Sequence, residues 1–478
     1  MQINSREKYK KNNKNFVKKC LLLWKNYIQY LKEKNNKNQK KKKGAKLPMR
    51  ILMLTWEYPP RIVGGIARVV HDLSKRLIKD GHEVTVITYK EGDLPEYEND
   101  KGVEVYRVEN YMIHPNNFID WTLQLNFNMV AKATELINKN GKFDVIHAHD
   151  WLVASSAKTL KQSFGIPLVA TIHATEAGRN SGIHDDSQRY INDTEWLLTY
   201  EATEVIVNSN FMKGHVQSLF GLPFDKINVI PNGINLTNFN GIERDYEFRR
   251  QYAMDNEKII LYVGRLVYEK GIQHLISAMP KIIQGYNDVK LVIAGKGGML
   301  DELKAQAEAM GIANKVYFTG YLNSKQVQKI YKCADVAVFP STYEPFGIVA
   351  LEGMLAGVPT VVSDVGGLDE IVDHGVNGMK SYAGNPNSIA DSVLTVLYDK
   401  QLAANMAKKA KQKVKEEFNW TKIAQDTHYI YEKAICKTVA EKQKQEIAQE
   451  NAKKAKKAGN TETEITNLLS FQKKHAYA

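Results

Sequence analysis

Apolar residues occur along this chain in short continuous runs, and these runs alternate with longer stretches of helical periodicity. The runs are rich in Val, Ile and Leu, which is typical of strands buried on both faces of a parallel sheet. They predict strands at 50–55, 83–88, 103–108, 143–147, 167–172, 204–208, 227–230, 258–263, 290–294, 315–318, 335–339 and 358–362. The helical stretches predict helices at 66–80, 151–163, 187–202, 210–220, 271–286, 298–310, 324–332, 346–356 and 386–399.

Strands that alternate with helices indicate an α/β fold whose parallel sheets are covered on both faces. The alternation of strands and helices fills two halves of the chain of nearly equal size. We therefore predict two doubly wound, Rossmann-like domains that face a central cleft. The turn cluster Pro231-Asn232-Gly233 is suited to the junction between them. Ligands bind such sheets at the carboxyl ends of the strands, which places the expected site in the cleft.

These patterns divide the chain into five parts. A basic, Lys/Asn-rich extension precedes an N-terminal domain and a C-terminal domain. Helices follow the second domain, and a polar tail ends the chain. In order, the predicted bounds are 1–48, 49–235, 236–400, 401–435 and 436–478.

The positive charge of the chain is confined to its first segment. The net charge is +13, with 66 basic and 53 acidic side chains. Residues 1–48 hold 16 of the basic and 2 of the acidic ones, which leaves 50 basic and 51 acidic side chains elsewhere. The body is therefore nearly neutral, and we expect no nucleic-acid partner.

The basic segment also has an apolar stripe, because apolar residues between Phe16 and Leu31 recur at helical spacing among lysines. This pattern is typical of a helix that lies on an anionic membrane surface or docks on a partner. A disordered solubilising tail fits equally, and so does translation that starts at Met49, directly before the first strand. All three interpretations stay open.

Cysteine usage indicates a reducing compartment. The chain has three scattered cysteines and no C-x-x-C pair, which argues against a disulfide framework and a zinc site. No apolar run approaches the roughly 18 residues that span a bilayer. We therefore expect a cytoplasmic protein, with peripheral membrane contact through the basic segment as the open alternative, and the sequence leaves the oligomeric state unknown.

The segment 341–357 carries two glutamates on a predicted strand–loop–helix unit. Pro345 is suited to the first turn of the helix, and a spacing of eight then places Glu344 and Glu352 on nearly one helix face. The rest of that helix is apolar or small, so both carboxylates need partners. Gly347 lets a ligand approach the helix start, where free amides favour an anion such as a phosphate. A pair of solvated surface glutamates is the alternative.

Two loops pair glycines with the start of a predicted helix. Gly64-Gly65 follows the first strand, and segment 264–271 reads Gly-Arg-Leu-Val-Tyr-Glu-Lys-Gly after the first strand of the second half. Arg265 and Lys270 would suit a diphosphate, because Arg forks onto oxygens and Lys supplies a point charge. A tight turn and a solvated loop are the alternatives.

Histidines gather at the ends of two predicted strands. His147-Ala-His149-Asp150-Trp151 follows one strand and His173 ends the next. Together they indicate a polar pocket, for example for a sugar. Their spacing matches no zinc pattern and the chain contains no D-x-D, so we expect no metal and no other cofactor.

These segments, in this order, resemble the family 4 retaining glycosyltransferases of the GT-B fold, and within them the glycogen and starch synthase group. The resemblance covers about residues 50–435. It is carried by the early Gly64-Gly65 pair, H-x-H-D-W (147–151), G-R-L-x-x-x-K-G (264–271), E-x7-E (344–352) and T-I-H-A-T-E-A-G-R-N (171–180). The last of these resembles glycogen-synthase-type members, some of which make maltose 1-phosphate.

The resemblance implies that the N-terminal domain holds the acceptor and the C-terminal domain holds a nucleotide sugar, with the helices at 401–435 packed back on the N-terminal domain. It also implies a role for each matching residue. A cation pair would bind the donor's diphosphate, one glutamate would contact the donor sugar near its anomeric carbon, and the other would hold the ribose hydroxyls. The catalytic residues it implies are Glu344, His173, Arg265 and Lys270. The donor-binding residues it implies are Gly64, Gly65, Gly264, Arg265, Lys270, Gly347, Ile348 and Glu352, and the acceptor and sugar side is formed by His149 and Asp150.

The resemblance therefore implies a metal-independent, retaining hexosyltransferase of the glycogen synthase type. It would move glucose from ADP-glucose or UDP-glucose to an α-glucan or a small glucosyl acceptor. Alternatives within the same fold are a maltose 1-phosphate synthase and a glycosyltransferase that acts on a lipid or on the cell envelope. Outside enzymes, a nucleotide-sugar-binding regulator stays open, although the intact glutamates and cations argue against it.

Overall fold

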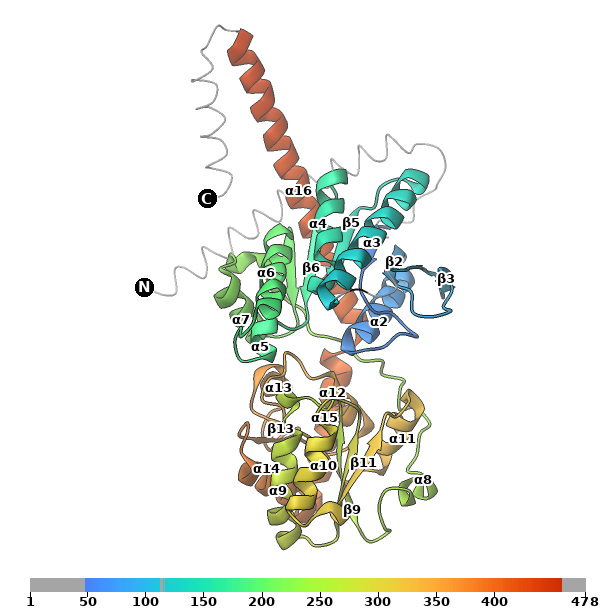
Figure 1. The fold of residues 1–478 in the computed structure, drawn as a ribbon, viewed down its shortest axis with the longest axis vertical. Coiled ribbons are helices and arrows are strands. Elements are labelled where there is room, and N and C mark those ends of the chain that lie inside the picture. The colour runs from blue at the N-terminus through green and yellow to red at the C-terminus, as the bar shows by residue number, and fades with distance from the viewer. Residues whose placement is uncertain (1–47, 112–114, 116, 458–478) are drawn as a thin grey trace, which may run out of the picture.

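The computed structural model describes residues 48–111, 115 and 117–457. Within this part the chain forms two domains, each built around a sheet and joined by a narrow waist (Figure 1). The first sheet has the order β3-β4-β2-β1-β5-β6-β7-β8, and the second has the order β11-β10-β9-β12-β13-β14. The predicted fold class, two doubly wound α/β domains, is confirmed.

The strands of the first sheet are β1 (Arg50–Leu54), β2 (Glu83–Tyr89), β3 (Tyr97–Asp100), β4 (Val103–Val108), β5 (Val145–His149), β6 (Leu168–Ile172), β7 (Glu204–Val207) and β8 (Ile227–Val229). Those of the second are β9 (Lys258–Val263), β10 (Val289–Ala294), β11 (Val316–Gly320), β12 (Val336–Phe339), β13 (Thr360–Ser363) and β14 (Met379–Ser381). Most predicted strands lie within two residues of these bounds.

The helices of the first domain are α2 (Gly65–Lys79), α3 (Phe118–Asn140), α4 (Ala154–Phe164), α5 (Glu176–Arg179), α6 (Asp186–Glu201) and α7 (Asn210–Phe220). Those that follow are α8 (Tyr246–Arg250), α9 (Ile272–Gly285), α10 (Leu300–Ala309), α11 (Ser324–Cys333), α12 (Ile348–Ala356), α13 (Gly366–Ile371), α14 (Pro386–Tyr398), α15 (Lys400–Glu417) and α16 (Trp420–Lys457). Short 3₁₀ turns are η1 (Trp151–Val153), η2 (Phe224–Lys226), η3 (Tyr268–Lys270) and η4 (Ala313–Lys315).

Some elements of the structure lack the patterns used for prediction. The edge strand β3 reads Tyr-Glu-Asn-Asp and pairs antiparallel with β4, so the first sheet is not parallel throughout as expected. In the second sheet, the edge strand β14 has only three residues. Strand β3 is half exposed and β14 is short, so neither has the apolar run used for prediction. Helix α3 is not among the predicted helices either, although its buried residues Leu125, Met129, Ala133 and Leu136 recur at helical spacing.

The core of each domain lies on both faces of its sheet, as the apolar strands require. In β1, Leu52 and Leu54 pack with α3 and α4 on one face, whereas Ile51 and Met53 pack with α2 and α16 on the other. All four side chains are fully buried. The alternation follows from the two-residue period of a strand. Packing on both faces holds β1, and with it the carboxyl end of this strand, near the middle of the sheet.

The chain crosses between the domains at two neighbouring places. The backbone N–H of Ile234 donates to the carbonyl of Phe418 at 2.9 Å, and Ile234 forms a parallel bridge with Asn419. At Gly233, an added Cβ would lie 2.7 Å from the ring of Trp420. The predicted junction at 231–233 thus lies beside the return crossing, and only a glycine leaves room for the indole there.

The prediction that the helices at 401–435 pack back on the N-terminal domain is wrong for α15, which packs on α12 and α14 of the second domain. Helix α16 does return and packs along the first sheet, from which it projects upward in Figure 1. Its buried residues in that core are Ile423, Ala424, Ile430, Tyr431, Ala434 and Ile435. The predicted tail from 436 begins inside this helix, which continues to Lys457. The basic extension, with its Phe16–Leu31 stripe, and residues 458–478 lie outside the described residues. Within the described part, no helix is both long and apolar enough to cross a bilayer.

Candidate active site

Lys270 and Glu344 meet at the carboxyl edge of the second sheet. Strands β9 and β12 are direct neighbours, and the loops that follow them carry Lys270 and Glu344 respectively. The Lys270 ammonium donates to the Glu344 carboxylate at 2.8 Å, and Glu344 is only 8% exposed. The sheet therefore joins two predicted site residues that are far apart in the sequence. A buried carboxylate with a cation beside it is suited to bind polar groups of a ligand.

Arg265, the other predicted cation of this loop, points toward solvent. Its side chain is 53% exposed and lies 3.5 Å from the carboxylate of Glu269. Neighbouring Gly264 is held within the fold, because an added Cβ would lie 2.7 Å from the Tyr262 hydroxyl. Gly264 thus has a packing role as well as its predicted place beside a ligand.

The start of α12 differs from the prediction. The helix begins at Ile348, with Gly347 as its N-cap at φ +106°, a backbone conformation that favours glycine. Pro345 lies ahead of the helix and not in its first turn, so helical spacing does not align Glu344 with Glu352. The loop geometry sets their positions instead. An added Cβ at Gly347 would lie 2.5 Å from Leu368, so the loop packs closely there.

Glu352 lies on α12 and binds a cation from the other domain. Arg68 of α2 donates to its carboxylate at 2.6 Å. Burial raises the pKa of Glu352, and the neighbouring Arg68 guanidinium opposes that rise. The contact joins the two domains. The Gly64-Gly65 loop also approaches α12, because an added Cβ at Gly65 would lie 3.1 Å from Ile348.

The Gly64 amide is already occupied by a carboxylate of its own domain. Buried Glu57 accepts hydrogen bonds from the amides of Gly64 at 2.9 Å and Ala67 at 3.2 Å, and from that of Val63. Burial raises the pKa of Glu57, whereas these N–H groups lower it. The resemblance implies that Gly64 binds the donor. In the structure, its amide donates to Glu57, whose carboxylate lies at the N-terminus of α2.

The predicted histidines form a buried cluster at the ends of β5 and β6. His149 and His173 share a hydrogen bond of 3.1 Å, and the backbone N–H of His173 donates to Asp150 at 2.7 Å. His147 bonds Tyr431 and Thr171 instead, each at 2.7 Å, and so ties α16 to the sheet. His149, Asp150 and His173 are thus brought together, while His147 has a structural partner on each side.

Burial keeps this cluster uncharged. It lowers the pKa of His147 to about 3 and holds that of His149 well below its usual value. Burial also lowers the pKa of His173, with nearby Asp150 opposing the effect. Neutral imidazoles donate and accept hydrogen bonds at neutral pH, which suits sugar hydroxyls better than phosphate.

Contacts between the domains converge on the loop that carries Glu344. The Tyr343 hydroxyl accepts a hydrogen bond from the Thr175 amide at 3.3 Å, and the Ser209 hydroxyl donates to the Pro345 carbonyl at 2.7 Å. The first domain therefore holds the residues on both sides of Glu344. Sequence reasoning missed Tyr343, Arg68 and Glu57. The partners of Tyr343 and Arg68 lie in the other domain, and no local pattern marks them. Glu57 bonds amides six to ten residues further along the chain, and a single glutamate in a loop gives no signal of that role.

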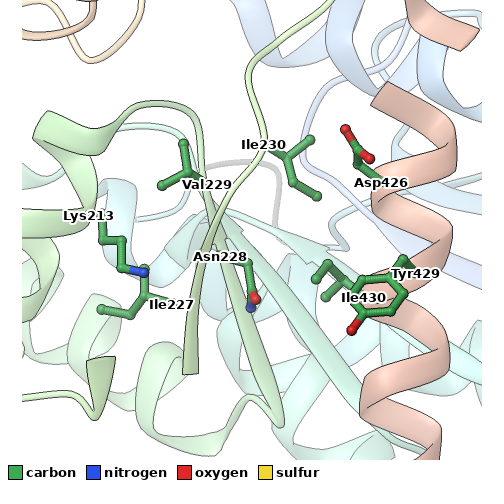
Figure 2. Close-up of a pocket in the computed structure, with 8 residues that line it drawn as sticks. All are labelled: Lys213, Ile227, Asn228, Val229, Ile230, Asp426, Tyr429 and Ile430. Carbon is green, nitrogen blue, oxygen red and sulfur yellow. The ribbon is translucent and has the colours of Figure 1, made fainter. Parts of the chain in front are cut away.

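A metal site and a further cavity were considered beside this site. Among the described residues, no group of three or more His, Cys, Asp or Glu side chains is placed to hold a metal ion. A cavity of about 380 Å³ lies between β8 and α16 (Figure 2), where Lys213, Asn228, Asp426 and Tyr429 are among its lining residues. None of the predicted site residues lines it.

The fold and the site together define a class, the GT-B glycosyltransferases. Residues 63–238 match the family described as Glycosyltransferase Family 4, and residues 244–413 match the one described as Glycosyl transferases group 1. The chain therefore belongs to the family 4 glycosyltransferases of the GT-B fold, and the predicted resemblance is confirmed.

Two relatives cover most of the chain. An uncharacterised glycosyltransferase of Methanocaldococcus jannaschii is 47% identical over 391 residues, which are 81% of this chain and 99% of that protein. The glycogen synthase of Mycobacterium tuberculosis is 36% identical over 397 residues, which are 80% of this chain and 94% of that protein. The chain is thus similar to glycogen synthases over nearly their whole length.

Solved structures agree on the fold. A sucrose-phosphate synthase from Thermosynechococcus elongatus has a TM-score of 0.69 at 22% identity, and the match covers 80% of this chain and 98% of that one. The Anabaena HepE protein in complex with UDP-glucose has a TM-score of 0.64 at 23% identity, with 82% and 100% covered. At these identities the likeness shows the fold alone.

Proposed function

We propose that this protein is a retaining glucosyltransferase that moves glucose from ADP-glucose or UDP-glucose to an α-glucan. The observation that carries the proposal is the buried Lys270–Glu344 pair at the carboxyl edge of the second sheet, which faces the first domain. The 36% identity to a glycogen synthase supports glucose as the transferred sugar and a glucan as the acceptor.

In this proposal, the second domain binds the donor and assists the departure of the diphosphate. Lys270 and Arg265 stabilise the negative charge that develops as the sugar–phosphate bond breaks. One preorganised donor of this kind typically contributes about 3 kcal/mol. Glu344 lies beside the anomeric carbon, where a carboxylate stabilises an oxocarbenium-like state. The amides of Gly347 and Ile348 complete the donor site.

The first domain supplies the sugar and acceptor side. The neutral imidazoles of His173 and His149 and the carboxylate of Asp150 bind hydroxyl groups, and the acceptor attacks from the face that the diphosphate leaves. Glu352 holds the ribose through one carboxylate oxygen while Arg68 keeps the other. Contact between the domains excludes water and so limits hydrolysis of the donor.

No metal takes part in this proposal, because the cations of the loops carry the charge of the diphosphate. We also keep the cytoplasm as the predicted compartment. Contact with a membrane surface rests on residues 1–48 and stays a prediction, as does the envelope-directed alternative that depends on it.

A second candidate is transfer to glucose 1-phosphate, which would make maltose 1-phosphate. It is favoured by similarity to the α-maltose-1-phosphate synthase of Mycolicibacterium smegmatis, which is 28% identical over 411 residues and 99% of that protein. The donor chemistry is the same in both candidates, and the acceptor separates them.

A donor and acceptor panel tests the proposal. The full chain is given ADP-glucose, UDP-glucose, GDP-mannose or UDP-N-acetylglucosamine, each with glycogen or glucose 1-phosphate, in the presence of EDTA. Release of nucleoside diphosphate and product mass are measured. We expect transfer from a glucose nucleotide to glycogen. Transfer to glucose 1-phosphate alone would replace the proposal by the second candidate, and use of another donor sugar would contradict both.

A further inference from the structure

A second pocket lies at the same edge of the first sheet as the histidine cluster. Its volume is about 460 Å³, within the range of small-ligand sites. Arg61 comes from the loop after β1, Tyr89 and Glu91 come from the end of β2, and Phe118 and Trp121 come from the start of α3. Strands β2, β1 and β5 are consecutive in the sheet, so this pocket is near the predicted acceptor side.

The wall of this pocket is aromatic. The rings of Phe118 and Trp121 are stacked, with centroids 5.6 Å apart and an interplanar angle of 8°. The ring of Tyr89 contacts that of Trp121 edge-on, with centroids 4.9 Å apart. Phe118 is 50% exposed, which is unusual for a large aromatic side chain that only fills a core. A flat, partly open aromatic surface is therefore available to a ligand.

The aromatic wall lies next to the predicted site. Phe118 contacts Trp151 edge-on, with ring centroids 6.0 Å apart. Trp151 directly follows Asp150, whose carboxylate accepts the backbone N–H of His173. Trp151 is only 4% exposed, so the pocket and the predicted site are neighbours across this buried ring.

The charges of the pocket are paired. Arg61 lies over the rings of Trp56 at 4.8 Å and Tyr89 at 5.3 Å, and its Nε lies 3.5 Å from the carboxylate of Glu91. Among the described lining residues, these two side chains carry the formal charges. The guanidinium is thus neutralised and held in place, which disfavours a phosphate and leaves polar groups for hydroxyls.

From these observations we infer that this aromatic pocket binds a neutral sugar ring of an oligosaccharide acceptor, one or more units away from the ring that receives glucose. The C–H face of a pyranose packs on Phe118 and Trp121, and its hydroxyls meet Arg61 and Glu91. The inference rests on the proposed function and deepens it. It favours a glucan chain over glucose 1-phosphate as the acceptor.

The test compares Phe118→Ala with Phe127→Ala, a control on the same helix whose aromatic ring is 77% exposed and does not line the pocket. Acceptors are maltose, maltotriose, maltopentaose and maltoheptaose, with the glucose nucleotide that supports transfer. In the wild type, KM should fall as the chain lengthens. Phe118→Ala should raise KM for maltoheptaose by about threefold to tenfold and flatten this dependence, and Phe127→Ala should match the wild type.

Phe118→Leu keeps the apolar volume but loses the flat ring, and it serves where the alanine variant does not fold. Titration of maltoheptaose, followed by tryptophan fluorescence, measures binding without turnover. Equal affinity of wild type and Phe118 variants for maltoheptaose would overturn the inference, even if transfer to glycogen occurs. No transfer to any glucan by the wild type would instead overturn the proposed function, and the titration would still decide whether the pocket binds sugar.

Discussion

At the scale of single residues, the site is built from buried carboxylates that each have a defined partner. Glu344 is held by Lys270 of its own domain, Glu352 by Arg68 of the other, and Glu57 by backbone amides. Burying a carboxylate is costly unless it is paired, so each pair fixes both members in position. The charge of the site is therefore preorganised before any ligand arrives.

The Lys270–Glu344 pair should be needed for both stability and turnover, and a double variant separates the two. Lys270→Met leaves a buried, unpaired carboxylate, which typically costs about 3–5 kcal/mol of unfolding free energy. Lys270→Met with Glu344→Gln removes both charges and should recover most of the Tm. Both variants should lose kcat by about a hundredfold or more, because the cation at the leaving diphosphate is gone.

Lys281→Met is the matched control for this pair. Lys281 bonds Asp391 at the surface, where an ion pair contributes little. Thermal unfolding and steady-state kinetics measure all three variants. A double variant that regains activity together with stability would show that the pair has a structural role alone.

Glu195 on α6 should make stability depend on pH. Its carboxylate accepts the Glu176 amide at 3.0 Å, and burial raises its pKa to about 8, with Arg179 opposing the rise and Asp150 adding to it. The folded state then keeps a proton that the unfolded state loses above about pH 4.5, so the free energy of unfolding falls as pH rises toward 8.

Glu195→Gln removes this titration and still offers one acceptor oxygen to the Glu176 amide. Relative to the wild type, its Tm should therefore rise as the pH is increased from 5 to 8. Asp193→Asn changes an exposed position on the same helix, and its Tm should change with pH as that of the wild type does. If the Tm of Glu195→Gln also changed with pH in parallel with that of the wild type, the assigned protonation of Glu195 would be contradicted.

At the scale of elements, the loop from β12 to α12 determines the site more than the helix that follows it. The sequence predicts the strand, the helix and the two glutamates, but it places the helix start two residues early. The reason is tertiary: Gly347 adopts a left-handed conformation against Leu368, and Pro345 accepts a hydrogen bond from Ser209. Packing of this kind leaves no trace in local periodicity.

Another contact between elements joins the domains through Glu370 on α13. Its carboxylate accepts the amides of Asn210 at 3.0 Å and Phe211 at 2.7 Å, at the N-terminus of α7. Glu370→Ala should disfavour the observed domain contact by about 1 kcal/mol. We expect kcat/KM for the donor to fall about fivefold, with little change in Tm.

Asp369→Ala is the control for Glu370→Ala. It removes the neighbouring carboxylate, which bonds Lys380 within the second domain. Equal kinetics of the two variants would mean that the Glu370 contact does not contribute to the working arrangement of the domains.

At the scale of the whole molecule, the sequence predicts the two-domain architecture because alternating strands and helices set it locally. The site residues at strand ends also follow, since parallel strands bring their carboxyl ends to one edge. The interdomain roles of Arg68, Tyr343 and Glu370 cannot be predicted from the sequence in this way. Their roles depend on how the two sheets meet, and that arrangement is set by crossings at Ile234 and Phe418 and by α16.

The stereochemistry of the product tests the central claim most directly. Glycogen or maltoheptaose is incubated with ¹³C-labelled glucose nucleotide, and the new linkage is examined by NMR at the labelled anomeric carbon. The account predicts an α-linked glucose, the configuration of the donor, formed with EDTA present and lost in Glu344→Gln. A β-linked product, or α-linked transfer that persists in Glu344→Gln, would contradict it.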